Sequence, residues 1–241
     1  MTTTTAGMLL GGRVHYAQPA QGYRTGLEPV LLAACVPARA GERALEVGTG
    51  AGAGLLCLAT RVPGIAGLGL EQDPLLAALA ADNFAANGFG GLAAVAADVA
   101  RWQSEALFDH AFANPPWHAA TGTESPVAGR RAAKQVTGDR MLATWVAAMA
   151  RALRPRGTIS LILPAALLTE AAQALAASQC GEMSLLPLWP RVGAPAKLIV
   201  VRAVRVGRGQ DRVLPGLVLH DAQAFTPQAE AILRGGAVLM A

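Results

Sequence analysis

Hydrophobic and polar positions follow two different patterns along this chain, one typical of strands and one typical of helices. From residue 44 onward the two patterns alternate. Short apolar runs predict buried strands, and apolar residues spaced three or four apart predict helices. Strands that alternate with helices predict parallel βαβ units and an α/β fold with a doubly wound sheet. The predicted strands are 44–47, 65–71, 92–97, 108–113 and 158–163, and the predicted helices are 53–60, 74–87, 139–153 and 165–179.

The alternation stops near residue 183. Residues 183–189 and 198–204 both have strand patterns, and no helical stretch separates them. Their short connection at 190–195 predicts an antiparallel pair. In the tail, Thr226 followed by Pro227 predicts a helix start, because threonine is a good N-cap and proline suits the first helical turn.

The segment before residue 44 has a different character. The Thr-rich start is expected to be loose, and alternation at Val14 and Tyr16 predicts a short strand or hairpin. A helix is expected over 28–36. We expect a single domain over 1–241, with an N-terminal cap segment over about 1–36 and a small C-terminal extension over about 206–241.

Composition narrows the class of protein. Hydrophobic residues make up 53% of the 241 residues and charged residues 15%, which indicates a folded chain with a sizeable core. No signal-peptide pattern and no run of about 18 apolar residues is found, so a cytoplasmic protein without a membrane span is expected. Cys35, Cys57 and Cys180 are far apart and form no Cys/His cluster, so no metal site is expected.

The net charge is +4, and arginine supplies nearly all of the basic residues. This balance permits a nucleic-acid partner without requiring one, and a coding bias toward alanine, glycine and arginine explains it equally well. Residues 121–138 have little periodicity and contain Arg130, Arg131 and Lys134. A loop of this length in a compact domain is usually functional or disordered, and these three cations are candidate phosphate contacts.

Asn114, Pro115, Pro116 and Trp117 directly follow the apolar run 108–113. An amide, two rigid rings and an aromatic plane at a strand end can bind a flat group that carries nitrogen. Taken alone, the tetrapeptide is equally compatible with a structural loop.

Upstream residues predict a cofactor site. The strand that contains Glu46 leads into a turn with Gly48, Thr49, Gly50 and Gly52, and a helix follows. Glycines allow close backbone approach to a ligand. Glu71 and Asp98 stand where the next two strands should end, which in α/β folds is the edge that binds nucleotides. Glu71 is placed to accept hydrogen bonds from ribose hydroxyls, and Asp98 can accept one from an adenine amino group. Either acid alone is also explained as a solvated loop carboxylate, but the two together with the glycine turn and residues 114–117 favour a binding site.

Together these residues resemble the class I S-adenosylmethionine-dependent methyltransferases whose motif is Asp/Asn-Pro-Pro-aromatic. The resemblance implies a Rossmann-like, mostly parallel seven-stranded sheet with an antiparallel C-terminal strand and helices on both faces. The front segment 18–32 is similar to bacterial tRNA(Val) adenine-N(6) methyltransferases, and this similarity implies that Tyr23 and Thr25 close over the methionine end of the cofactor. Trp117 departs from the commoner tyrosine or phenylalanine.

The resemblance implies transfer of a methyl group to an adenine amino nitrogen in tRNA, next to the anticodon. Asn114 and the Pro115 carbonyl would accept the N–H groups, Pro116 would stiffen the turn, and Trp117 would stack on the base. His118 is either a proton acceptor or a flanking residue.

Four alternatives stay open at this point: a methyltransferase that acts on a protein glutamine, a DNA adenine methyltransferase, a nicotinamide-dependent dehydrogenase, and a non-catalytic RNA-binding protein. The sequence does not predict the oligomeric state.

Overall fold

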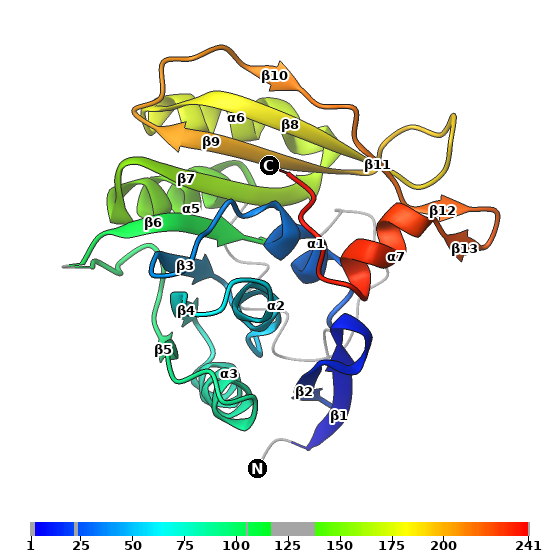
Figure 1. Cartoon of the computed structure of the whole chain (residues 1–241). Coiled ribbons are helices and arrows are strands. Elements are labelled where there is room, and N and C mark those ends of the chain that lie inside the picture. Colours follow the sequence, from blue (N-terminus) through cyan, green and yellow to red (C-terminus); the bar gives the residue numbers. More distant parts are fainter. Residues whose placement is uncertain (1–2, 22–23, 105, 117–137, 241) are drawn as a thin grey trace.

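A mixed sheet of nine strands forms the centre of the fold (Figure 1). The computed structural model describes residues 3–21, 24–104, 106–116 and 138–240. The strand order is β10-β8-β9-β7-β6-β3-β4-β5, and β11 also pairs with β8. The strands are β3 Arg43–Val47, β4 Ala66–Glu71, β5 Leu92–Ala96, β6 Phe108–Ala113, β7 Leu153–Pro164, β8 Cys180–Trp189, β9 Leu198–Arg205, β10 Arg212–Val213 and β11 Leu217–Val218.

The predicted mixture of strand directions is confirmed. Strands β5, β4, β3, β6 and β7 are parallel to one another, whereas β9 is antiparallel to both β7 and β8. The predicted number of seven strands is wrong by the two short strands β10 and β11, which both pair with β8. Each has only two residues, too few to show a period in the sequence.

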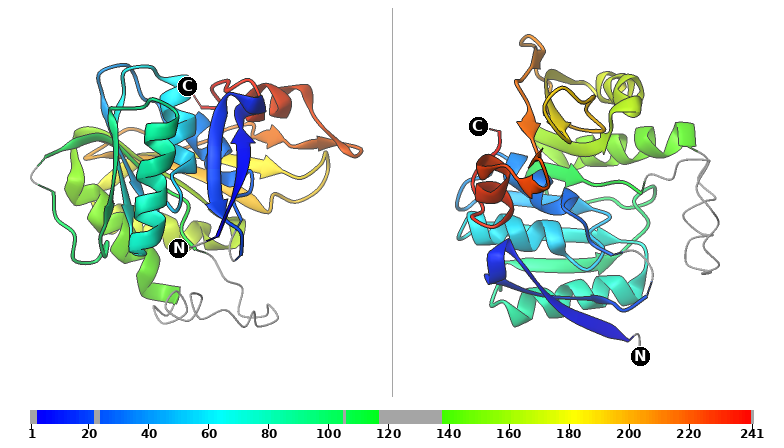
Figure 2. Two further views of the ribbon diagram at one scale, coloured as in Figure 1. Left: turned by 90° about the horizontal axis from the view of Figure 1, so that it is seen from below. Right: turned by 90° about the vertical axis from the view of Figure 1, so that its right-hand side faces the viewer.

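Helices cover both faces of the sheet, as predicted (Figures 1 and 2). One apolar cluster joins the sheet to α1, α2, α3 and α7, and a second joins the opposite face to α5 and α6. These helices are α1 Glu28–Cys35, α2 Ala53–Arg61, α3 Pro74–Ala86, α5 Gly138–Ala152, α6 Leu168–Ala177 and α7 Pro227–Leu233. In the described part of the chain, no helix is long and apolar enough to cross a membrane.

Three predicted boundaries are wrong by three residues or more, and one of them is the start of β8, which lies at Cys180 and not at residue 183. Strand β7 begins at Leu153, directly after α5, although Pro155 and Gly157 had indicated a turn before residue 158. The predicted helix 165–179 is a short 3-10 turn, Ala165–Leu167, followed by α6. The N-cap prediction is confirmed, because the Thr226 hydroxyl accepts a hydrogen bond from the Ala229 N–H at 3.1 Å.

The N-terminal segment forms a separate two-stranded antiparallel sheet of β1 (Thr4–Leu9) and β2 (Val14–Pro19). The expectation that the Thr-rich start is loose is therefore wrong for Thr4 and Thr5, since threonine is a good strand former; Met1 and Thr2 lie outside the described residues. Strand β2 contacts α3 and α2, so this hairpin lies against the helical layer and not at an edge of the main sheet (Figure 1).

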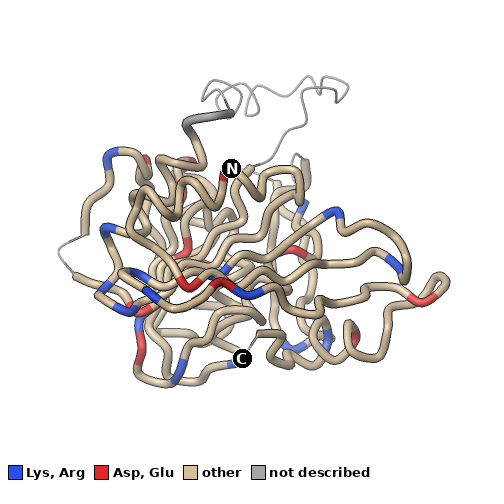
Figure 3. Tube along the Cα trace, turned by 90° about the horizontal axis from the view of Figure 1, so that it is seen from above, with Lys and Arg blue, Asp and Glu red and all other residues tan. Residues whose placement is uncertain are grey.

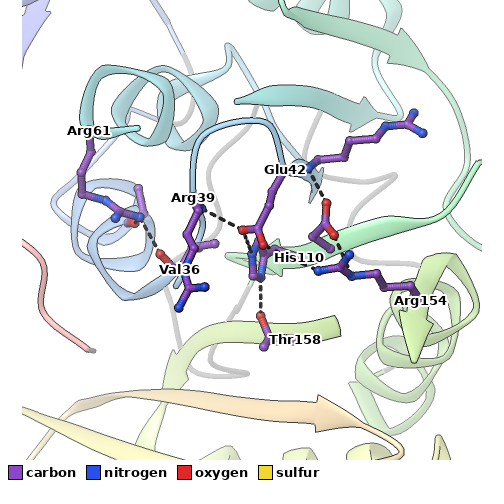
Figure 4. A network of polar contacts seen from close by, with 10 residues as sticks. Val36, Arg39, Glu42, Arg61, His110, Arg154 and Thr158 are labelled. Atoms are coloured by element: carbon purple, nitrogen blue, oxygen red, sulfur yellow. Dashed lines mark hydrogen bonds and ion pairs between the residues drawn. The ribbon is translucent and has the colours of Figure 1, made fainter. Parts of the chain in front are cut away.

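A polar network stabilises the sheet at the edge where β3 and β6 begin (Figure 4). His110 Nε2 lies 2.8 Å from Glu42 Oε2, and His110 Nδ1 lies 2.8 Å from the Thr158 hydroxyl. Burial lowers the pKa of His110, so the ring is neutral and donates from Nε2 to the carboxylate. Burial alone would raise the pKa of Glu42, but hydrogen bonds from His110 and the Arg39 N–H outweigh it and lower that pKa. The network lies at the sheet edge opposite the candidate site described next.

Candidate active site

Four strand ends bring the predicted site residues to one edge of the sheet. Parallel strands β3 and β6 are neighbours with Val47 opposite Ala113, so Gly48 and Asn114 leave the sheet side by side. On the other side of β3, strand β4 ends at Glu71, which is paired with Ala96 of β5. Asp98 follows β5 by two residues. This edge is where open α/β sheets bind ligands.

The glycine turn between β3 and α2 has an open side. Gly48, Gly50 and Gly52 all have positive φ, at +70°, +56° and +89°. A Cβ on Gly48 would meet the Trp145 ring at 2.6 Å, and a Cβ on Gly52 would meet the Phe84 ring at 2.5 Å. Within the part of the chain that the structure describes, no atom beyond Gly50 and its two chain neighbours lies within 4 Å of a Cβ placed on Gly50. The outer glycines thus permit packing, whereas the middle one faces open space.

Glu46 organises this turn from below. Its side chain is only 4% exposed, and Oε2 accepts hydrogen bonds from the Thr49 hydroxyl at 2.6 Å and the Leu55 N–H at 3.0 Å. The carboxyl group thus receives the first N–H groups of α2, a favourable place for negative charge. A side chain on Gly54 would collide with the Glu46 carboxyl, which explains why glycine stands inside the first turn of α2.

Burial raises the pKa of Glu46 to about 7, against the opposing effect of its hydrogen bonds from Thr49 and Leu55. The groups that Glu46 binds belong to the protein. Glu46 would therefore affect cofactor binding indirectly, by fixing the shape of the turn.

Glu71 is held in a fixed orientation at the end of β4. Its Oε2 accepts the Gly50 N–H at 2.9 Å and its Oε1 accepts the Asp73 N–H at 3.0 Å. Each carboxylate oxygen keeps a further lone pair that can accept another hydrogen bond. Asp98 is exposed, and its Oδ1 accepts the Ala100 N–H at 2.9 Å. Both acids can therefore accept donors from a bound nucleoside.

The Asn-Pro-Pro segment leaves the end of β6 directly beside the glycine turn. Asn114 is half-buried, Pro115 is buried and Pro116 is exposed, so the segment turns outward from the sheet. Trp117, His118, Arg130, Arg131 and Lys134 lie outside the described residues, as does Tyr23.

Thr25 is bound to the N-terminal hairpin. Its hydroxyl lies 2.7 Å from the Tyr16 hydroxyl, and its N–H donates to Gln18 Oε1 at 3.0 Å. The sequence interpretation missed Tyr16 as a partner of Thr25, because its strand period indicated only burial. It also missed Asn83, whose amide donates to the Ala51 carbonyl in the glycine turn at 2.9 Å. A buried asparagine within an apolar helix was the available signal.

The site has the features that an adenosine cofactor needs. Gly50 offers open backbone surface, and Glu71 stands directly next to it as an oriented carboxylate. Asp98 supplies a second acceptor at the neighbouring strand end. Among the described residues, no group of three or more His, Cys, Asp or Glu side chains is arranged to hold a metal ion.

Residues 29–178 match the family called Methyltransferase small domain, and the chain belongs to that family. It is an S-adenosylmethionine-dependent methyltransferase with a Rossmann-like fold. This assignment argues against the nicotinamide-dependent dehydrogenase and the non-catalytic RNA-binding protein.

Two curated proteins that are similar to the chain share one name, tRNA1(Val) (adenine(37)-N6)-methyltransferase. The protein from Aeromonas hydrophila is 27% identical over 201 residues, which cover 83% of each chain. The protein from Flavobacteriaceae bacterium strain 3519-10 is 29% identical over 143 residues, which cover 59% of this chain and 60% of that protein.

Solved structures show the same fold. A predicted O-methyltransferase from Agrobacterium tumefaciens superposes with a TM-score of 0.73 at 21% identity, over 88% of this chain and 98% of that one. The T. thermophilus 16S rRNA N2 G1207 methyltransferase, solved with AdoMet and guanosine, superposes with a TM-score of 0.56 at 21% identity, over 84% of this chain and 50% of that one.

The raised pKa of the buried Glu46 carboxyl should make the stability of the protein depend on pH. Its folded pKa of about 7 lies above its ordinary value of 4.5, so its contribution to stability is fully present below pH 4.5 and is lost as pH rises through 7. Glu46→Gln removes this dependence. Between pH 5 and 8, the free energy of unfolding of the cofactor-free variant should rise relative to wild type by roughly 2–3 kcal/mol. Urea unfolding at several pH values measures it, and a difference that does not vary with pH would contradict this account of Glu46.

Proposed function

We propose that this enzyme methylates the exocyclic amino nitrogen of an adenine in tRNA, with tRNA(Val) next to the anticodon as the specific target. The observation that carries the proposal is the register of β3 and β6, which sets Asn114 beside Gly48 at one sheet edge. The names of the two curated relatives support the tRNA substrate.

The proposed mechanism depends mainly on positioning. The lone pair of an adenine amino group is delocalised into the ring, which makes the nitrogen a poor nucleophile. The Asn114 side-chain oxygen and the Pro115 carbonyl each accept one N–H of that group. These two hydrogen bonds favour a tetrahedral nitrogen and direct its lone pair toward the donor. When bound, S-adenosylmethionine supplies a methyl group that is already activated by a cationic sulfur.

Other residues of the chain hold the two reactants. Glu71 would bind the ribose of the cofactor, and Asp98 would bind the amino group of the cofactor's adenine. The turn Gly48–Gly52 would let the backbone approach the cofactor closely. Tyr23 and Thr25 would close over its methionine end. Trp117 would stack on the target base, a contact worth about 1–3 kcal/mol, after the base leaves its stack in the RNA. Pre-set acceptors and correct orientation would then lower the barrier.

The chain carries cations at the same sheet edge that could bind phosphate. Arg191 and Lys197 are exposed on the connection between β8 and β9. This connection lies at the edge where β7 ends, because Leu198 pairs with Pro164. Arg130, Arg131 and Lys134 follow the Asn-Pro-Pro segment in sequence. Among the described residues, Lys and Arg positions are spread along the trace (Figure 3).

A methyl-transfer assay tests the substrate. Purified enzyme with labelled S-adenosylmethionine should label tRNA, and nucleoside analysis should return N6-methyladenosine. Asn114→Ala should keep S-adenosylhomocysteine affinity within about twofold and lower turnover by about 10²–10³-fold, the effect of removing one oriented hydrogen-bonding group.

Two outcomes would decide against parts of the proposal. Label in glutamine of a protein fraction, or in DNA and not in tRNA, would replace tRNA by the corresponding alternative. A variant Asn114→Ala with the wild-type rate would exclude the assigned role of Asn114.

The salt dependence of tRNA binding tests the cationic residues. Arg191→Ala with Lys197→Ala should reduce the slope of log affinity against log salt by between one and two, since each phosphate contact contributes about 0.7–0.9. The triple change Arg130→Ala, Arg131→Ala and Lys134→Ala should reduce it by up to about two to three. Arg39→Ala, an exposed residue at the opposite sheet edge, is the matched control and should leave the slope unchanged. Equal slopes in all variants would contradict phosphate contact at this edge.

A further inference from the structure

Two asparagines hold the N-terminal hairpin: Asn83 in the last turn of α3, and Asn87, which caps the C-terminus of that helix. Asn83 Oδ1 accepts the Ala17 N–H at 2.9 Å, and Asn83 Nδ2 donates to the Ala17 carbonyl at 2.8 Å. One turn later, Asn87 Oδ1 accepts the His15 N–H at 2.9 Å and Nδ2 donates to the His15 carbonyl at 2.7 Å. The two side-chain amides therefore pair with alternate residues of β2, as the backbone of a neighbouring strand would.

The two asparagines differ in one contact. Asn83 Nδ2 also donates to the Ala51 carbonyl at 2.9 Å, and Ala51 lies between Gly50 and Gly52 in the glycine turn. The second donor bond of Asn87 goes to the Asn83 carbonyl of its own helix, at 2.8 Å. Asn83 thus joins the hairpin to the turn, whereas Asn87 joins the hairpin to the helix alone.

Asn83 is a buried polar group whose cost is offset by complete use of its donors. Its side chain is 4% exposed, and it makes three of the four hydrogen bonds that an asparagine side chain offers. Leaving any of these groups unpaired would cost stability. An apolar residue would fill the same space between α3, β2 and the turn, so the amide is explained by what it connects.

The hairpin is also hydrogen-bonded to the segment that contains Thr25. Tyr16 and Gln18, the neighbours of Ala17 in β2, hold the Thr25 hydroxyl and N–H. Hydrogen bonds therefore join the Ala51 carbonyl to Asn83 and Asn83 to β2, and further hydrogen bonds join β2 to Thr25. It links two parts of the chain that would bind opposite sides of one cofactor.

We propose that Asn83 is a positioning residue that fixes the N-terminal hairpin, and with it the segment around Thr25, against the cofactor turn. It contacts no reacting atom; it sets the distance between the two parts that enclose the cofactor. The inference rests on S-adenosylmethionine as cofactor and is independent of the proposed tRNA substrate.

Asn83→Asp and its matched control Asn87→Asp test the proposal. Each change keeps the side-chain shape and removes the amide donors. The affinity for S-adenosylhomocysteine, measured by calorimetry, should fall at least tenfold in Asn83→Asp and less than twofold in Asn87→Asp. The thermal unfolding temperature of the cofactor-free protein should be lower in both variants than in the wild type. Similar affinities in the two variants would overturn the assignment, since the contact with Ala51 would then have no effect of its own.

A measurement on the wild-type protein covers the case in which Asn83→Asp does not fold. Hydrogen–deuterium exchange should slow in residues 14–19 and 24–27 when S-adenosylhomocysteine is added, because the bound turn would hold the hairpin more firmly through Asn83. Unchanged exchange in 14–19 while 48–55 becomes protected would show that the hairpin is not coupled to the cofactor, and the proposal would fail. Both measurements use the cofactor product alone, so their outcome is separate from the identity of the methyl acceptor.

Discussion

The buried carboxyl of Glu46 is the interaction on which the site depends. It lies at the end of β3, under the first turn of α2, and holds the Thr49 hydroxyl and the Leu55 N–H on one oxygen. A carboxyl at a helix N-terminus compensates the partial positive charge there. Burial works against its ionised form and raises its pKa to about 7. The strand, the glycine turn and the helix are therefore fixed to one another by a single group that is itself close to its titration point.

The remaining parts of the site are arranged around this turn. Glu71 holds the Gly50 N–H from the end of β4, Asn83 holds the Ala51 carbonyl from α3, and Trp145 of α5 packs on Gly48. A strand of the sheet and one helix from each face thus fix this turn of five residues, and among the described residues the side at Gly50 is open. Because β6 is the neighbour of β3, Asn114 leaves the sheet next to that open side. The register of two adjacent parallel strands thus brings the candidate cofactor turn and the proposed acceptor residue together.

The parts of this arrangement that could be predicted are those that depend on residues close together in the sequence. The run 108–113 was predicted with its exact bounds, and the Thr226 cap was predicted from two adjacent residues. Sequence period did not show that Thr4–Leu9 forms a strand, because the strand depends on pairing with β2, and β2 in turn depends on its tertiary contacts with α3. For the same reason Asn83 and Tyr16 were missed, since their partners lie 66 and 9 residues away, respectively. Residues that make contact across elements carry no local signal beyond an unexpected polar group in an apolar stretch.

The most direct test of the account is a crystal structure of the protein with S-adenosylhomocysteine and adenosine. The cofactor should lie on the open side of Gly50, with its ribose hydroxyls on the Glu71 carboxylate and its sulfur on the side of Asn114. The amino group of the added adenosine should bind the Asn114 side-chain oxygen and the Pro115 carbonyl. A cofactor bound elsewhere, or a ribose without contact to Glu71, would contradict the central claim that the turn held by Glu46 is the cofactor site.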